Sequence, residues 1–257
     1  MTGASSGLGR EFARVLAGRG YRVLAVARRG DRLDVLAEEV LRDGGRLEPL
    51  VADLSQMNGV EAVLNVAAGR EVDLLVNNAG LATYGEFVSA SPERQRELVR
   101  LNVEAVVALT SRMLPAMVER GRGGVINVAS QMAFQPMPYF AAYAASKAFV
   151  LSFSEALAEE VRGTGIRVTA IAPGFVRTEF AAVAGSEAPE RRFPHLRPEH
   201  VVAAALRAHQ RGRVVKVVGS LYVLLTLAGR FAPRAVLRRM MERVMRPQPS
   251  DSTSKTQ

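Results

Sequence analysis

Residues 124–147 read GVINVASQMAFQPMPYFAAYAASK, in which a short apolar run and an alanine-rich run flank a loop. The apolar run Gly124–Val128 is typical of a buried strand. Ala142–Ala148 is rich in alanine and contains no glycine or proline, which favours a helix. Ser130 therefore lies just after the predicted strand, where its hydroxyl can face the side chains of the helix that follows.

Two side chains of this predicted helix can act together with Ser130. Tyr143 and Lys147 are four positions apart, so they lie on one face of a helix. A phenol titrates near 10, which is too high for proton transfer at neutral pH unless a cation lies close. The three residues thus indicate proton transfer to or from a substrate oxygen. The alternative is purely structural: a packed tyrosine, a lysine that reaches solvent and a serine in a turn.

The same strand-and-helix pattern recurs along the chain. Further strands are expected at Tyr21–Ala27, Leu47–Ala52, Val72–Val76, Ile166–Ile171 and Val214–Val218. Helices are expected at Arg10–Arg19, Asp31–Arg42, Asn58–Ala68, Pro92–Met117, Ala142–Arg162 and Pro198–Arg211. Buried strands that alternate with helices predict an α/β fold, a doubly wound parallel sheet with helices on both faces.

The first residues, MTGASSGLG, form a glycine-rich loop that leads into the first predicted helix. Glycines at such a loop let the backbone approach a phosphate, which then binds at the helix N-terminus. In dinucleotide-binding units an acidic residue at the end of the second strand binds the ribose 2′-hydroxyl, whereas an arginine accommodates a 2′-phosphate. Here Ala27 stands at that position and Arg28 and Arg29 follow it. The pattern favours NADP over NAD, and the alternative is a solvated loop with two charges.

Composition excludes several other classes of site. The chain has no cysteine, which excludes disulfides and thiolate metal sites. Its three histidines, at positions 195, 200 and 209, lack the paired spacing of metal ligands, so we expect no metal. The longest apolar stretch, Val214–Ala228, is interrupted by polar residues and glycine and is shorter than a membrane span. No signal peptide opens the chain, and a cytoplasmic protein is expected.

The net charge of +9 is concentrated at the C-terminal end. From Ala203 onward there are 11 basic and 2 acidic residues, whereas the two signs balance before it. Within 221–246 the residues from Ala235 form a basic amphipathic helix. Its apolar face could contact an anionic membrane surface, or it could cover the protein's own core or a subunit interface. Nucleic-acid binding is not expected, because no aromatic platform accompanies the charge.

Seven sequence elements together carry a family resemblance. They are TGASSGLG (2–9), Asp53, NNAG (77–80), Asn102, Ser130, YAASK (143–147) and PGFVRT (173–178). In order and approximate spacing they resemble the short-chain dehydrogenase/reductase family from the first residue to about Thr178. The resemblance implies a Rossmann-like sheet and an oxidoreductase that interconverts a carbonyl and its alcohol with NADP(H) in preference to NAD(H).

The resemblance also implies roles for individual residues. Tyr143 would be the general acid and base, and Lys147 would assist it and hold the nicotinamide ribose. Ser130 would orient the substrate carbonyl, and Asn102 would hold a water in a proton relay, which accounts for an asparagine inside a helix. Further cofactor contacts would come from Gly3, Ser5, Ser6, Gly7, Leu8, Gly9, Arg28, Arg29, Asp53, Leu54, Asn78, Ala79, Gly80, Pro173, Gly174, Val176 and Thr178.

One feature departs from the family pattern. Members place a full strand before the Thr-Gly of the glycine motif, whereas only Met1 precedes Thr2 here. A missing strand of about 5–6 residues would leave the neighbouring strands with unpaired edges. We expect the natural start to lie upstream, with a GTG valine codon taken as the initiator. The alternative is a true variant with a gap in its sheet.

The expected organisation is one catalytic domain over residues 1–246, followed by a disordered tail at 247–257. Within the domain, 179–197 is a substrate-loop insert and 221–246 a basic C-terminal extension. The substrate is expected to be a hydrophobic ketone or aldehyde and its alcohol, and the chain a dimer or tetramer. Two alternatives stay open: a catalytically silent dinucleotide-binding protein, and a membrane-surface reductase of lipid-like carbonyls.

Overall fold

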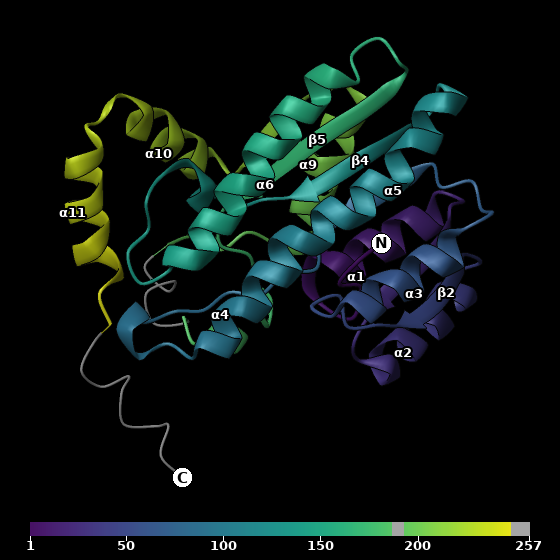
Figure 1. The fold of residues 1–257 in the computed structure, drawn as a ribbon, viewed down its shortest axis with the longest axis horizontal. Coiled ribbons are helices and arrows are strands. Elements are labelled where there is room, and N and C mark those ends of the chain that lie inside the picture. Colours follow the sequence, from purple (N-terminus) through teal and green to yellow (C-terminus); the bar gives the residue numbers. More distant parts are fainter. Residues whose placement is uncertain (187–192, 248–257) are drawn as a thin grey trace.

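The computed structural model describes residues 1–186 and 193–247, and its strands are all parallel. β1 (Arg22–Ala27) pairs with β2 (Arg46–Val51). The other four strands form a sheet in the order β3 (Leu74–Asn77), β4 (Gly123–Val128), β5 (Ile166–Pro173) and β6 (Val215–Val218). Figure 1 shows β4 and β5 side by side, with β2 farther along near α2 (Gly30–Arg42) and α3 (Met57–Ala67). The predicted parallel α/β sheet is confirmed.

The N-terminal residues lie between these two groups of strands. The Thr2 amide donates to the Val76 carbonyl at 3.0 Å, and the Val26 amide donates to the Met1 carbonyl at 2.9 Å. Thr2 also forms an isolated parallel bridge with Val26, but no full strand fills the position. Met1 and Thr2 therefore connect the two groups of strands through single backbone contacts. The Met1 ammonium donates to the Leu24 carbonyl, and its burial lowers the pKa of that ammonium to about 5.

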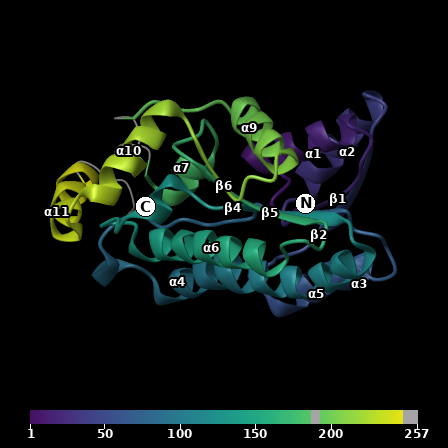
Figure 2. The same ribbon diagram turned by 90° about the horizontal axis from the view of Figure 1, so that it is seen from above.

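Helices cover both faces of the sheet, as Figure 2 shows. One face carries α3 (Met57–Ala67), α4 (Pro92–Val99), α5 (Ala105–Arg120) and α6 (Ala141–Glu160). The other carries α1 (Gly7–Gly18), α2 (Gly30–Arg42) and α9 (Pro198–Gln210). Each layer encloses its own apolar core, one around Phe12 and Leu36 and the other around Leu109 and Met117. Each fully buried side chain of this size stabilises the fold by about 1.5–3 kcal/mol.

The predicted boundaries agree with the structure within a few residues, and two predictions need correction. β2 was expected to be buried on both faces, yet Val51 at its end is 61% exposed. The reason is that β2 pairs only with β1 and forms the edge of its sheet. The single helix expected over Pro92–Met117 is instead α4 and α5 joined by a π-helical turn, Arg100–Glu104.

The insert and the C-terminal extension both fold into helices near the same end of the sheet. The insert contains α7 (Phe180–Ala184), and the extension forms α10 (Ser220–Phe231) and α11 (Arg234–Met245). Residues 187–192 of the insert and 248–257 of the predicted tail lie outside the described residues. Gly219, with a φ of 101°, turns the chain from β6 into α10 in a conformation that favours glycine.

The apolar face of α11 is divided between the protein interior and solvent. Leu237 and Met245 are buried, and Met245 joins an apolar cluster that also contains Tyr143. Val236 and Met240 stay exposed. Two hydrogen bonds fix the helix, from the Tyr84 hydroxyl to the Met245 carbonyl (2.8 Å) and from the Tyr139 hydroxyl to the Glu242 carboxylate (3.0 Å). The buried residues of α11 therefore agree with the interpretation that its apolar face covers the protein's own core.

Among the described residues, one helical stretch, Pro92–Arg120, is long and apolar enough to cross a membrane by length and composition alone. It carries the buried polar side chains of Asn102 and Thr110 and packs against β4. These contacts are those of a helix in the protein core. The inward face of such a helix is apolar because it packs against the core.

Candidate active site

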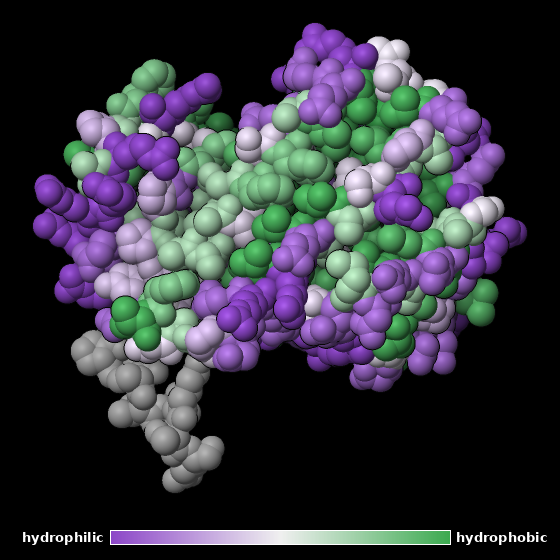
Figure 3. Space-filling view, viewed as in Figure 1, coloured by the Kyte–Doolittle hydropathy of each residue, from purple (hydrophilic) through white to green (hydrophobic). Residues whose placement is uncertain are grey.

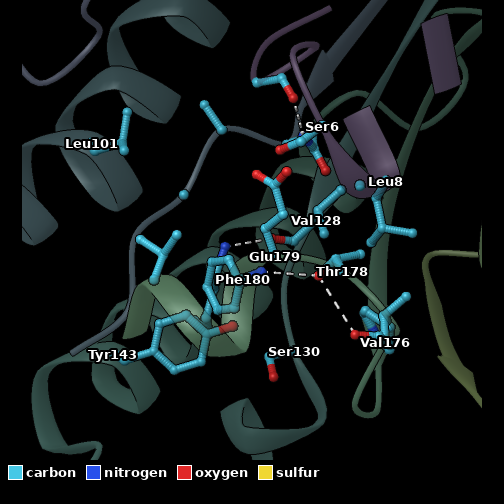
Figure 4. Close-up of a pocket in the computed structure, with 18 of the residues that line it drawn as sticks. Ser6, Leu8, Leu101, Val128, Ser130, Tyr143, Val176, Thr178, Glu179 and Phe180 are labelled. Carbon is cyan, nitrogen blue, oxygen red and sulfur yellow. Dashed lines mark hydrogen bonds between the residues drawn. The ribbon is translucent and has the colours of Figure 1, made fainter. Parts of the chain in front are cut away.

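A cavity of about 350 Å³ opens where the strands β1, β4 and β5 end. In parallel sheets of this kind ligands bind at the carboxyl ends of the strands. The cavity walls include Ser5, Ser6 and Arg29 at one end and Ser130, Tyr143 and Lys147 at the other. Figure 4 shows the Tyr143 side chain with its hydroxyl directed toward Ser130. Strand, loop and helix thus bring together the three residues that the sequence analysis selected.

Lys147 is the buried cation of this site. Its side chain is 5% exposed, and its ammonium donates to the Val128 carbonyl at 2.8 Å. The Nζ atom lies 5.9 Å from the centroid of the Tyr143 ring, so the charge lies beside the phenol. Burial lowers the pKa of Lys147 to about 8. Ser130, at the end of β4, accepts a hydrogen bond from the Met132 amide at 3.2 Å.

Asn102 lies in the π-helical turn and connects several parts of the site. Its Oδ1 accepts from the Leu81 amide, and its Nδ2 donates to the Leu81 carbonyl and to Ser146 Oγ, each at 2.9 Å. Ser146 Oγ in turn donates to the Tyr143 carbonyl at 2.7 Å. Single π-turns inside helices occur often at functional sites, because they redirect one side chain. Asn102 does not line the cavity, but it fixes the loop and the helix that do.

The N-terminal loop passes directly in front of α1. A Cβ on Gly9 would come within 2.0 Å of the Gly3 carbonyl oxygen, so the loop packs on α1 only because residue 9 is glycine. Gly7 has a φ of 53° and would place a Cβ 2.9 Å from Thr178. Gly3, Gly7 and Leu8 line the cavity, whereas Gly9 does not. The amides at the start of α1 are thereby open to an anion in the cavity.

The two arginines after β1 have different surroundings. Arg29 donates through Nη2 to Ser6 Oγ at 2.8 Å and to Ser5 Oγ at 3.1 Å. Arg28 instead forms an ion pair with Glu97 at 2.9 Å and a longer one with Asp53 at 3.9 Å. Both arginines line the cavity. Arg29, which is bordered by hydroxyl groups, is the better placed of the two to bind a phosphate.

The remaining predicted contacts come from the ends of three strands. Asp53 accepts from the amide and hydroxyl of Ser55, and Asn78 donates to the Thr2 carbonyl at 3.0 Å. These bonds hold the loops that border the cavity. The predicted residues that line it from here are Asp53, Leu54, Asn78, Ala79, Gly80, Pro173, Gly174, Val176 and Thr178.

The insert and the C-terminal extension add further residues to the cavity, and of these Tyr222 and Glu179 were not predicted from the sequence. Tyr222 of α10 lines the cavity, and a Cβ on Gly174 would meet its ring at 2.0 Å. Phe180 lies against Tyr143 with ring centroids 5.7 Å apart. Glu179 lines the cavity between Thr178 and Phe180 and pairs with Arg29 and Arg32. The insert was expected to lie at the substrate, whereas nothing local to the sequence connects Tyr222 of the extension to the site.

The donors around the cavity fit a nicotinamide dinucleotide. Backbone amides at the start of α1 suit a pyrophosphate, and Arg29 with Ser5 and Ser6 suits a further phosphate. At the far end, Ser130, Tyr143 and Lys147 surround the space left for a reacting group. Within 1–186 and 193–247, no group of three or more histidine or acidic side chains is placed to hold a metal ion.

Comparisons with known sequences agree with this geometry. The family described as short chain dehydrogenase matches residues 1–188. An uncharacterised oxidoreductase of Myxococcus xanthus is 43% identical over 185 residues, which span 71% of this chain and 73% of that protein. The human very-long-chain 3-oxoacyl-CoA reductase is 31% identical over 189 residues, which span 71% of this chain and 60% of the relative.

A comparison with solved structures extends the similarity to nearly the whole chain. A short-chain dehydrogenase from Sphingobium yanoikuyae, solved in complex with NADPH, is 32% identical and superposes with a TM-score of 0.81. The superposition covers 96% of both chains. The relatives are named as reductases, dehydrogenases and oxidoreductases. The chain therefore belongs to the short-chain dehydrogenase family and is an oxidoreductase with a dinucleotide cofactor.

Proposed function

We propose that this protein is an NADP(H)-dependent reductase that interconverts a hydrophobic ketone or aldehyde and its alcohol. The observation that carries the proposal is one continuous cavity, with Arg29, Ser5 and Ser6 at one end and Ser130, Tyr143 and Lys147 at the other. A cofactor with an extra phosphate matches the first end, and a carbonyl oxygen matches the second.

In the proposed reaction the bound cofactor supplies or accepts the hydride. The Tyr143 hydroxyl gives a proton to the substrate oxygen in reduction and takes it back in oxidation. Ser130, toward which Tyr143 points in Figure 4, would donate a hydrogen bond to the same oxygen. The Lys147 ammonium beside the Tyr143 ring favours the phenolate that remains after proton transfer. Asn102 would fix this helix and hold a water for the proton relay.

Two observations support NADP(H) rather than NAD(H). Ala27 ends β1 where an acidic residue would bind a 2′-hydroxyl, and Arg29 follows beside two serine hydroxyls. In addition, the Sphingobium yanoikuyae structure is a complex with NADPH. Arg28 contributes less in our proposal, because its partners are the carboxylates of Glu97 and Asp53, whereas Arg29 also donates to two serine hydroxyls.

The walls near Tyr143 favour an apolar substrate. They are made mainly of apolar and aromatic side chains, namely Met132, Phe140, Phe175, Phe180, Val183 and Tyr222. A polar sugar would leave its hydroxyls without partners along such a wall, which is costly. The name of the human relative, a very-long-chain 3-oxoacyl-CoA reductase, points in the same direction.

The proposal is tested by fluorescence titration with NADPH and NADH, followed by a screen of apolar ketones. We expect tighter binding of NADPH than of NADH, and turnover that is lost in Tyr143→Phe. Equal binding of the two cofactors would contradict the NADP preference. The alternative of a silent dinucleotide-binding protein would be favoured if the protein binds cofactor but turns over no carbonyl. Tyr143→Phe should then bind the cofactor as the wild type does.

A membrane-surface reductase is a second candidate, favoured by the outer face of α10. Leu224 and Phe231 are 62% and 87% exposed on that face, and exposed arginines follow on α11. In Figure 3, hydrophilic residues gather along the left edge, where α11 lies. Apolar side chains beside arginines suit an anionic lipid surface. Sedimentation with anionic and with neutral vesicles tests this, and a chain that stays in solution with both contradicts it. The cytoplasm remains the predicted location.

A homo-oligomer is also proposed, through the face formed by α5 and α6. Phe149 is 40% exposed on α6 and stacks on Phe153, with ring centroids 5.8 Å apart. Figure 3 shows apolar residues gathered in the middle of this side of the molecule. A second copy would cover such a face, because exposed apolar patches mark contact surfaces. Sedimentation velocity of the protein and of Phe149→Asp would measure the change, with dissociation expected in the variant.

A further inference from the structure

Glu179, the first residue of the insert, lies between Arg29, which lines the cofactor end of the cavity, and Arg32 in the first turn of α2. Its Oε2 accepts from Arg29 Nη1 at 2.9 Å, and Arg32 Nη1 lies 2.6 Å from Oε1 and 2.7 Å from Oε2. Hydrogen bonds from Arg29 and then Arg32 lower the pKa of the Glu179 carboxyl, so it is ionised at neutral pH. The two arginines are 150 and 147 positions away in sequence, and the pairing is a product of the fold.

These groups together form a site for a doubly charged anion. Arg29 brings a guanidinium that also holds Ser5 and Ser6, and Arg32 brings a second guanidinium. Arg29 is the N-cap residue of α2 and Arg32 lies in its first turn, where the helix dipole favours a negative charge. The site has two positive charges and two hydroxyls, whereas Glu179 supplies only one negative charge.

The position of Glu179 is linked to the reacting end of the cavity through the next residue. Phe180 follows directly, and its ring lies 5.7 Å from the ring of Tyr143. Figure 4 shows Phe180 between Glu179 and Tyr143, above the tyrosine ring. The Thr178 hydroxyl accepts from the Phe180 amide at 3.3 Å, which holds the two residues in one tight turn. A shift of the Glu179 backbone therefore changes how Phe180 covers Tyr143.

We propose that the Glu179 carboxylate occupies the place of the cofactor's 2′-phosphate and competes with it for Arg29 and Arg32. The inference rests on the proposed NADP(H) dependence and adds to it a specificity-determining residue outside the catalytic group. Binding of a 2′-phosphate displaces Glu179, and Phe180 moves away from Tyr143. A cofactor without the 2′-phosphate leaves Glu179 paired and Phe180 in place.

The charges explain why the two anions exclude each other. A phosphate monoester carries about −1.5 to −2 charges at neutral pH, which the two arginines already balance. With the phosphate bound, the Glu179 carboxylate would be a third negative charge at the same site and would be repelled by the phosphate. The Glu179 side chain is 48% exposed, so each of its ion pairs is weak and can be exchanged. Removing the competing carboxylate should strengthen 2′-phosphate binding about three- to tenfold.

The first test measures binding of two cofactor fragments by calorimetry, adenosine 2′,5′-bisphosphate and adenosine 5′-monophosphate. The protein, Glu179→Gln and Glu155→Gln are compared, since Glu155 is an exposed acid on α6 and its variant controls for net charge. We expect Glu179→Gln to bind the bisphosphate about three- to tenfold more tightly than the protein and the control. Binding of the monophosphate should not change in either variant.

The outcomes separate this inference from the proposed function. Wild-type preference for the bisphosphate, with no change in Glu179→Gln, would overturn the competition and leave the NADP preference standing. A wild-type protein that binds both fragments equally would overturn the NADP preference and the inference with it. An equal gain in affinity for both fragments in Glu179→Gln would also contradict the inference, since the gain would then not depend on the 2′-phosphate.

A second test follows the loop itself by hydrogen–deuterium exchange of peptides that cover residues 176–186. Adenosine 2′,5′-bisphosphate lacks the nicotinamide, so it displaces Glu179 without covering the loop. We expect faster exchange in these peptides on adding the bisphosphate and no change on adding the monophosphate. Slower exchange with the bisphosphate would contradict the displacement, because a loop that stays paired beside a bound ligand becomes more protected.

Discussion

The Lys147 ammonium lies 5.9 Å from the centroid of the Tyr143 ring, and both side chains come from the same face of α6. The Val128 carbonyl, at the end of β4, accepts a hydrogen bond from that ammonium at 2.8 Å. The helix and the strand are thus joined at the point where the proposed proton transfer takes place. This relationship gives the first two predictions, one for the phenol and one for the amine.

Replacing Tyr143 with phenylalanine should remove turnover while leaving the cofactor end of the cavity intact. The phenol is the proposed proton donor, and a positioned acid or base contributes about 10²–10⁴ to a rate. We expect kcat/KM to fall by about that factor, with little change in NADPH binding. Tyr21→Phe is the matched control, because Tyr21 is 43% exposed outside the cavity. Turnover that survives in Tyr143→Phe would assign the proton transfer to another group.

The Lys147 amine should titrate near pH 8 in the cofactor-free protein. Burial lowers its pKa to about 8, and the chain has only three lysines, at positions 147, 216 and 255. Lysine labelled with ¹³C at Cε should therefore give three NMR signals. The signal that disappears in Lys147→Met should show its midpoint near pH 8. A midpoint for this signal near 10.5 would show that the ammonium is not desolvated as described.

This shift also sets a dependence of stability on pH, with a defined sign. A folded pKa of about 8 lies below the ordinary lysine value of 10.5, so the unfolded chain binds more protons between these pH values. Stability should rise with pH through this window, by about 3 kcal/mol for the lysine alone. We expect the rise in wild type but not in Lys147→Met, measured as urea unfolding free energies. Parallel curves for the two proteins would contradict it.

Asn102 should be important for stability as well as activity. The side-chain amide of Asn102 makes hydrogen bonds with the backbone amide and the backbone carbonyl of Leu81. It also donates a hydrogen bond to Ser146 Oγ. Asn102→Ala leaves these buried groups unpaired, which should cost about 2–4 kcal/mol of unfolding free energy. Asn65→Ala is the control, because Asn65 is exposed on α3. Equal unfolding midpoints for the two variants would show that water replaces the lost amide at no cost.

The sequence was sufficient for the layers of the fold and for one end of the site. Buried strands and helices have distinct periods, and the motif around Tyr143 and Lys147 is local, so each could be recognised without long-range information. The elements were placed within a few residues. The π-turn at Asn102 could not be predicted, because its helical pattern differs from an α-helix only by one inserted residue.

Long-range pairings account for the rest of what was missed. Arg32 looked like an ordinary helix residue, and Glu179 like part of a variable loop, yet the fold pairs them across 147 positions. Tyr222 belongs to the C-terminal extension, which was interpreted mainly from its basic face. The Tyr222 ring nevertheless lies beside Gly174 in the cavity. Such contacts depend on how whole elements pack, and no period or motif in a single sequence reports that.

His209 on α9 provides a separate prediction, away from the cavity. Its Nδ1 lies 3.0 Å from the Thr169 hydroxyl, and its ring packs so closely on Gly124 that a Cβ there would come within 2.3 Å of Nε2. Burial, and then the charge of Arg167, lower the pKa of His209 to about 4. The folded protein therefore holds this histidine neutral at pH values where an unfolded histidine is protonated.

Acid should consequently destabilise the protein through His209. Between pH 6.5 and 4 the unfolded chain binds the extra proton, so the unfolding free energy should fall as pH falls, by about 3 kcal/mol from this residue. Paired carboxylates also lose stability in acid, so the difference from His209→Gln isolates the histidine. We expect that variant to lose less stability between pH 6.5 and 4 than wild type. His200→Gln, exposed on the same helix, should follow wild type. Three parallel pH curves would show that His209 is protonated without cost and that its burial in α9 does not control acid stability.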